Sequence, residues 1–225
     1  MPPDDTHKIL HVLRMRDGDR IEIIDSTTRR FEAVIGEPAR CVQAQLDRMI
    51  EEQTESRLRL TVAQALPKGQ KMDFVIEKLT ELGAAAIIPM RTERTIVSGA
   101  ALQKVDRWRR LAKTAAAQCG RQSIPRIEDV RDFSEVLSTF DAYDRVLLPW
   151  ELAQHQPLRT QLPQLLENAG TVLVLIGPEG GFSHAEAESA RAAGAQLISL
   201  GRRILRTETA ALVALAIIGY ILDDG

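Results

Sequence analysis

A chain of 225 residues, of which 44% are hydrophobic and 27% charged, is long enough to bury a sizeable core, which excludes an intrinsically disordered protein. The formal net charge of −2 argues against a strongly basic nucleic-acid binder, and two cysteines exclude a disulfide framework. The longest apolar run, 210–222, is too short to span a bilayer, and the first residues do not read as a signal peptide. We therefore expect a globular cytoplasmic protein with no membrane association.

The near-neutral total hides an uneven distribution of charge. Residues 91–131 carry 10 basic and 4 acidic side chains, whereas residues 132–225 carry 6 basic and 12 acidic ones. A local excess of six positive charges is compatible with a surface that contacts a polyanion, although most charged runs are only solvated helix faces.

The first third of the chain has the pattern of strands. Apolar and polar residues alternate, as in half-buried strands, over three segments: 20–25, 30–36 and 57–65. These segments predict a small β-rich module over residues 1–66, with a hinge near 65–69.

From about residue 67 the apolar period becomes helical. A first helix is expected to end at Gly83, a short buried strand follows at 84–90, and a long helix spans 102–119 and ends at Gly120. Continuous apolar runs at 145–150 and 171–177 are typical of strands in a parallel sheet that is buried on both faces.

Two capping boxes lie among these strands, at 132–135 and 183–186, and each predicts the start of a helix. The alternation of strands and helices predicts an α/β domain over residues 67–225.

Two loops of this domain have the composition of a ligand site. Gly177, Gly180 and Gly181 follow a buried strand, in the position where α/β sheets bind ligands. Their spacing matches neither the dinucleotide fingerprint nor the phosphate loop. By itself this segment is equally compatible with a tight turn that binds nothing.

The second loop precedes the apolar helix at 210–222. It holds Arg202, Arg203 and Arg206 beside Glu208, and Thr207 is a natural N-cap of the helix. The plain interpretation is a cap with solvent-facing arginines. Because the helix is apolar nearly all round, its first turn should instead face the interior or a partner subunit, where arginines need anionic partners.

Four ordered blocks carry a resemblance that covers nearly the whole chain from about residue 7. The blocks are QALPKGQKMDFVIEKLTELGAAAIIPMRTERTIV, RWRRLAKTAAAQCGRQSIP, IGPEGGFS and SLGRRILRTETAA. In these blocks the chain resembles the small-subunit ribosomal RNA uridine N3-methyltransferase (RsmE) family of the SPOUT superfamily. The resemblance implies a PUA-like β-barrel RNA-binding domain at 1–66 and an α/β trefoil-knot methyltransferase domain at 67–225. It also implies S-adenosyl-L-methionine as cofactor, a homodimer, and small-subunit (16S) ribosomal RNA, within the assembled small subunit, as substrate.

Residue roles follow from the same resemblance. The cofactor would be held by Ile176, Gly177, Glu179, Gly180, Gly181, Leu200, Gly201, Ile204, Leu205, Thr209 and Ala210. Arg206 would stabilise negative charge that develops on the base, and Glu208 would orient Arg206 or accept a proton. RNA phosphates would be contacted by Arg14, Arg91, Arg94, Arg107, Arg110 and Arg121.

Two alternatives stay open at this stage. The same fold could methylate a different RNA position, or the chain could bind ribosomal RNA without catalysis. No metal site is expected, because His7 and His11 have a helical spacing that favours packing or capping and no third ligand is evident.

Overall fold

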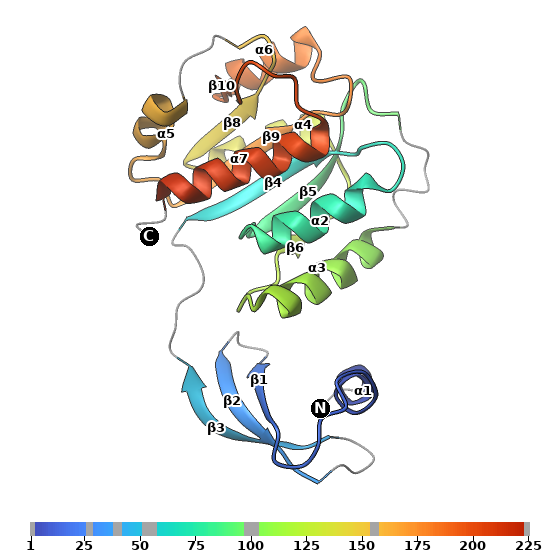
Figure 1. The fold of residues 1–225 in the computed structure, drawn as a ribbon. Coiled ribbons are helices and arrows are strands. Elements are labelled where there is room, and N and C mark those ends of the chain that lie inside the picture. Colours follow the sequence, from blue (N-terminus) through green and yellow to red (C-terminus); the bar gives the residue numbers. More distant parts are fainter. Residues whose placement is uncertain are drawn as a thin grey trace. The chain divides into compact units, whose positions relative to one another are not determined.

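The computed structural model describes residues 3–25, 29–37, 42–50, 58–96, 104–153 and 158–222 (Figure 1). The chain forms two compact units, residues 1–54 and 55–225. The boundary expected at residue 66 is wrong, because strand β4 (Arg59–Ala65) pairs inside the sheet of the larger unit. An alternating pattern identifies a strand but does not say which sheet it joins.

The smaller unit contains a three-stranded antiparallel sheet. Its order is β1 (Arg20–Ile24), β2 (Arg30–Ile35), β3 (Ala44–Ile50). A short helix α1 (Pro3–His7) and a π-helix η1 (Lys8–Val12) precede the sheet. Ile9, Ile35 and Val42 form its small core. The first two strands confirm the predicted alternation, whereas β3 was not predicted.

The larger unit is built on one parallel sheet. Its order is β10-β8-β9-β4-β5-β6, and β7 also pairs with β5. Every strand pair in it is parallel, which confirms the predicted parallel sheet. Besides β4 the strands are β5 (Ala86–Arg91), β6 (Arg126–Ile127), β7 (Arg131–Asp132), β8 (Arg145–Pro149), β9 (Thr171–Ile176) and β10 (Gln196–Ile198).

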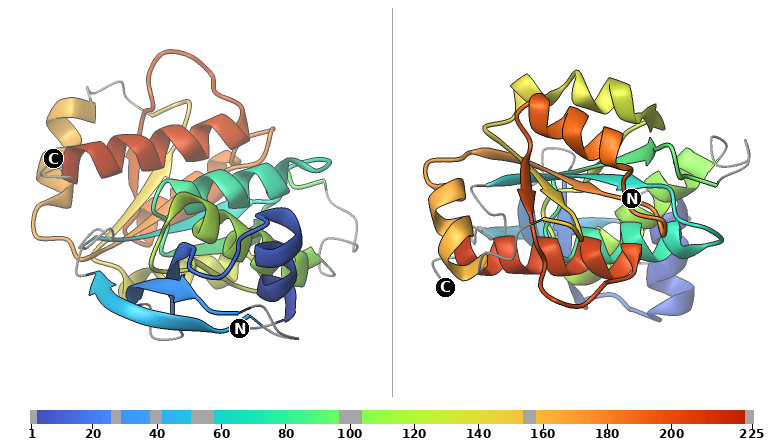
Figure 2. Two further views of the ribbon diagram at one scale, coloured as in Figure 1. Left: turned by 60° about the horizontal axis from the view of Figure 1, so that its bottom comes forward. Right: turned by 90° about the horizontal axis from the view of Figure 1, so that it is seen from above.

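Helices cover both faces of this sheet (Figure 2). One face packs against α2 (Lys71–Glu81), α3 (Val105–Cys119), α5 (Leu158–Leu166) and α7 (Thr207–Leu222). The other packs against α4 (Phe133–Leu137), the 3-10 turn η3 (Phe140–Ala142) and α6 (His184–Ala192). Along β9, Val172, Val174 and Ile176 enter the first core, and Leu173 and Leu175 enter the second. Burial on both sides explains the continuous apolar run of this strand.

The predicted helix ends are largely confirmed. Both capping boxes are formed, at the starts of α4 and α6. Gly83 and Gly120 follow α2 and α3 with φ of 90° and 74°, a left-handed conformation that glycine adopts at little cost. The expected first residues of the long helix, 102 and 103, lie outside the described residues.

Helix α7 starts three residues before the expected apolar run. Its buried side is made of Ala211, Ala214, Leu215 and Ile218, whereas Tyr220 is 85% exposed. Over the described residues we find no helix long and apolar enough to cross a membrane. No cluster of three or more potential metal ligands occurs there either, and the rings of His7 and His11 lie 4.8 Å apart.

Candidate functional site

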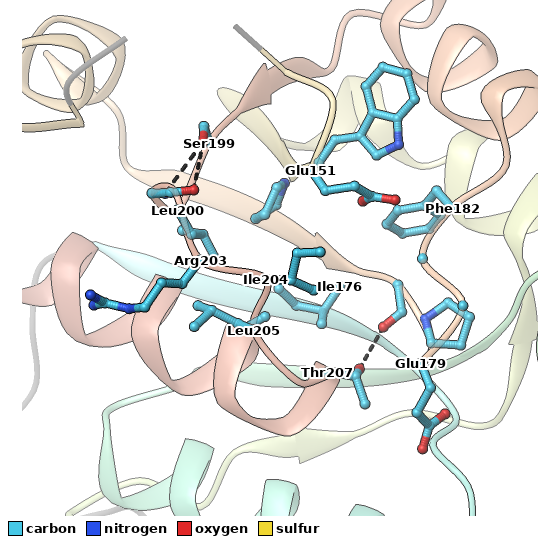
Figure 3. A pocket seen from close by; sticks show the side chains of 18 of the residues that line it. Glu151, Ile176, Glu179, Phe182, Ser199, Leu200, Arg203, Ile204, Leu205 and Thr207 are labelled. Carbon is cyan, nitrogen blue, oxygen red and sulfur yellow. Dashed lines mark hydrogen bonds between the residues drawn. The ribbon is translucent and has the colours of Figure 1, made fainter. Parts of the chain in front are cut away.

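A pocket of about 340 Å³ lies where strands β8, β9 and β10 end, which is the edge of a parallel sheet that commonly binds ligands (Figure 3). All but one of the residues predicted to hold a cofactor line it; these are Ile176, Gly177, Glu179, Gly180, Gly181, Leu200, Gly201, Ile204, Leu205 and Ala210. Thr209 is not among the lining residues. The sheet thus brings together two loops that lie far apart in sequence.

The loop after β9 requires glycine for steric reasons. A Cβ at Gly177 would lie 3.2 Å from backbone atoms of Gly181 and Phe182. Gly181 has a φ of +65°, and a Cβ there would lie 2.9 Å from a carboxylate oxygen of Glu151. A Cβ at Gly180 would meet only the side chain of Arg94, at 3.4 Å. Two of the three glycines are therefore set by geometry.

The loop after β10 supplies an apolar wall. Ile204 is 90% exposed although it lines the pocket, and Leu200 and Leu205 lie in the same loop (Figure 3). The hydroxyl of Ser199 accepts a hydrogen bond from the backbone N–H of Gly201 at 3.3 Å. An apolar side chain with as much free surface as that of Ile204 is suited to cover a flat aromatic ligand.

Thr207 connects the two loops instead of capping its helix. It is the first residue of α7, it is buried, and its hydroxyl donates a hydrogen bond of 2.5 Å to the carbonyl oxygen of Gly177 (Figure 3). The same hydroxyl accepts a hydrogen bond of 2.8 Å from the side-chain amide of Gln64 in β4. The expected N-cap is thus a bridge between segments.

Lys71 was missed by sequence reasoning. Its ammonium group lies 3.2 Å from the carboxylate of Glu208 and 3.4 Å from that of Glu179. Glu208 is therefore paired with Lys71, while its expected role of orienting Arg206 or accepting a proton stays a prediction. Nothing in the sequence pattern indicated this pair, because it joins the first turns of helices α2 and α7.

Glu179 is held as a carboxylate. Burial is the largest single influence and opposes ionisation, but hydrogen bonds from its own backbone and from Lys68, together with Lys71, outweigh burial and lower the pKa of Glu179. A lowered pKa makes this carboxylate a poor proton acceptor near neutral pH.

Arg206, the other predicted catalytic residue, is exposed. It is not among the lining residues, although both neighbours in sequence, Leu205 and Thr207, line the pocket. The backbone of residue 206 therefore lies at the rim of the pocket.

The predicted RNA-contacting arginines are in different environments. Arg91 pairs with Asp132 at 2.8 Å, and Arg107 pairs with Asp73 at 2.5 Å. Arg94 donates to the carbonyl oxygen of Gly180 at 2.7 Å and so contacts the glycine loop. The side chains of Arg14 and Arg110 are exposed.

Arg121 does not have the surface position that was predicted for it. Its side chain is buried and donates to the carbonyl oxygens of Thr80 and Ala84 at 3.0 and 2.7 Å. These bonds satisfy one backbone acceptor in the last turn of α2 and one in the connection to β5, so the residue supports the fold. A run of basic residues cannot distinguish a buried arginine from an exposed one.

We expect Arg121→Met to lower the free energy of unfolding by about 1–3 kcal/mol, because it removes the donor to the buried carbonyl oxygen of Ala84, whereas the carbonyl of Thr80 keeps the backbone N–H of Gly83. Denaturant unfolding measures this change. Arg110→Met on exposed α3 surface is the matched control, with a change within about 0.5 kcal/mol. RNA affinity should fall in Arg110→Met and stay unchanged in folded Arg121→Met. A loss of RNA affinity in folded Arg121→Met would contradict the structural role.

Several lining residues were not predicted as site residues: Pro149, Trp150, Glu151, Pro178, Phe182, Ser199, Arg202, Arg203 and Thr207. Trp150 is buried and its indole N–H has no hydrogen-bond partner within the described structure. Trp150 and Glu151 directly follow β8, so the end of that predicted strand was the signal that could have found them.

A parallel α/β sheet with a glycine-containing pocket at the carboxyl ends of its strands defines a ligand-binding domain of the kind that enzymes use. Residues 54–219 match a family model described as an RNA methyltransferase domain. That match spans more than half of the chain, and the chain therefore belongs to this RNA methyltransferase family.

Curated relatives and solved structures agree with this membership. The ribosomal RNA small subunit methyltransferase E of Bacillus subtilis is 34% identical, with 96% of this chain and 88% of the relative covered. The protein of the same name from Neisseria gonorrhoeae, solved with S-adenosyl methionine, gives a TM-score of 0.86 at 30% identity, with 98% and 90% of the two chains covered. A putative methyltransferase from Legionella pneumophila, solved with the same cofactor, gives 0.81 at 28% identity, also with 98% and 90% covered.

Proposed function

We propose that this protein transfers the methyl group of S-adenosyl-L-methionine to the N3 atom of a uridine in small-subunit ribosomal RNA. The observation that carries the proposal is the pocket at the ends of β8, β9 and β10, which is lined by nearly all the residues that the family resemblance assigns to the cofactor. The names of the relatives, and the bound cofactor in two similar structures, support the same activity.

The pocket offers different surfaces to the parts of this cofactor. Ile204, Leu205 and Leu200 would cover the adenine ring, and backbone groups of Gly177 and Gly201 would bind its polar edge. The sulfonium methyl is intrinsically reactive, so the protein has to align it with the nucleophile and exclude water.

The chemical step needs little more from the protein. The bound cofactor would supply the methyl group to N3, with its sulfur as leaving group, and the N3 proton would leave to water. Arg206 at the pocket rim would stabilise the negative charge that develops on the base. We assign Glu208 to holding Lys71, because protonating it would break that ion pair.

The finer features of the fold belong to the same proposal. We infer a trefoil knot in the α/β domain from the resemblance to the SPOUT methyltransferases, and the match to an RNA methyltransferase domain is in line with it. The small antiparallel sheet would be part of a PUA-like RNA-binding domain. Exposed Tyr220 on the otherwise apolar α7 is consistent with a homodimer contact, and a ribosomal RNA substrate implies a cytoplasmic protein.

The decisive experiment is incubation of the protein with unmodified small ribosomal subunits and labelled S-adenosyl-L-methionine, followed by mass spectrometry of the digested nucleosides. We expect N3-methyluridine, identified by co-elution with a standard. Label in another nucleoside would support the proposed cofactor but show that the enzyme methylates a different RNA position. Bound cofactor and bound RNA without transfer would favour the non-catalytic RNA-binding alternative.

A further inference from the structure

A buried chain of hydrogen bonds runs from β4 through α7 to the glycine loop. We propose that Gln64 is a positioning residue of the cofactor pocket, which acts through Thr207 on the carbonyl of Gly177. The proposal rests on the proposed function, because it concerns how the same pocket is held in shape. None of these contacts is local, since Gln64 and Thr207 are 143 residues apart.

The directions of the hydrogen bonds follow from the atoms involved. The carbonyl oxygen of Gly177 can only accept, so the single hydroxyl hydrogen of Thr207 is donated to it, at 2.5 Å. The hydroxyl oxygen is then left as an acceptor, and the amide nitrogen of Gln64 donates to it at 2.8 Å. The other amide hydrogen goes to the carbonyl of Ala65 at 2.8 Å.

This arrangement fixes the orientation of the Gln64 amide. Rotating the amide by half a turn would point its oxygen at the carbonyl oxygen of Ala65, and two acceptors cannot bond to each other. Gln64 also lies directly opposite Ile176 in the register of β4 and β9, one residue before Gly177. The amide is therefore anchored in the sheet at the point where the glycine loop begins.

The amide oxygen of Gln64 points to a role other than stability. Gln64 is fully buried, and its oxygen has no hydrogen-bond partner among the described residues. An unpaired buried acceptor disfavours folding, and an apolar side chain of the same shape would avoid that cost. The presence of a glutamine here is explained by the hydrogen bond that its amide nitrogen donates to the hydroxyl of Thr207.

The function of the chain of hydrogen bonds is to fix the distance between the two loops of the pocket. Gly177 belongs to the loop after β9, and Thr207 ends the loop after β10, and both residues line the pocket. Without the bridge each loop could move independently, and the cofactor would have to restore their spacing when it binds. Affinity for the cofactor should fall, while the rate of methyl transfer at saturation should change little.

The test compares isosteric variants by titration calorimetry with S-adenosyl-L-methionine and by steady-state kinetics with ribosomal subunits. We expect Thr207→Val and Gln64→Met to raise Kd and KM for the cofactor about fivefold to tenfold, the effect of losing about one buried hydrogen bond. Thr207→Ser keeps the hydroxyl and should restore affinity to within about twofold of the original. The kcat should remain within about threefold in all three.

Thr80→Val is the matched control for a buried hydroxyl. The Thr80 hydroxyl donates to the carbonyl of Ile76 within α2, away from the pocket, so its loss should lower the melting temperature but not the affinity. Equal affinities of Thr207→Val, Gln64→Met and the original protein, or an equal loss in Thr207→Ser, would overturn the proposal. Failure of the original protein to bind the cofactor at all would instead overturn the proposed function.

Discussion

Replacing Gly181 by alanine is expected to raise the Kd for S-adenosyl-L-methionine at least about tenfold. Gly181 has a φ of +65°, and a residue with a Cβ in that region carries a strain of about 1–2 kcal/mol. The added Cβ would also lie 2.9 Å from the Glu151 carboxylate. The loop would relax in the free protein, so the cofactor would have to restore the strained form on binding. Titration calorimetry gives the Kd directly.

Gly180→Ala is the matched control, one residue earlier in the same loop. Gly180 does not have a positive φ, and a Cβ there would touch only the flexible side chain of Arg94 at 3.4 Å or more. We expect its Kd to stay within about threefold of the original, as for most substitutions that introduce no strain. If both alanine variants lost the same affinity, backbone strain at residue 181 would not be the cause.

Arg206→Ala is expected to lower kcat for methyl transfer by about 100-fold or more, the effect of removing one group that stabilises charge in a transition state. Its side chain does not line the pocket, so the Kd for the cofactor should be unchanged. Single-turnover measurements with saturating ribosomal subunits and cofactor isolate the chemical step. The defect should also persist at high RNA concentration, because the proposed role is in the transition state and not in RNA binding.

Arg91→Ala is the comparison that separates charge stabilisation from RNA contact. Arg91 is exposed, pairs with Asp132 and lies at the end of β5, outside the pocket. If it contacts an RNA phosphate, its loss should raise KM for RNA and reduce the salt dependence of binding, with kcat retained. An Arg206→Ala enzyme with the same pattern, a raised KM and a normal kcat, would show that Arg206 binds RNA and does not act in the chemical step.

Much of the larger unit could be predicted from local sequence. The capping boxes at 132–135 and 183–186 both start helices, and the apolar runs at 145–150 and 171–177 contain β8 and β9. Both kinds of signal depend on interactions within a few residues or on burial of a whole segment, which composition reports directly. The small unit was harder to predict, since β3 has a mostly exposed surface and no clear alternation.

Local sequence was enough to identify an α/β protein with one glycine-rich loop and one arginine-containing loop, and its four blocks pointed to most of the residues that line the pocket. Three features became known only from contacts between distant segments: β4 belongs to the larger unit, Lys71 pairs with Glu208, and Arg121 is buried. These facts depend on strand order and on contacts between segments far apart in the chain. A local pattern fixes the period of a segment and the face it buries, but the partner of each side chain depends on where the sheet places the next segment.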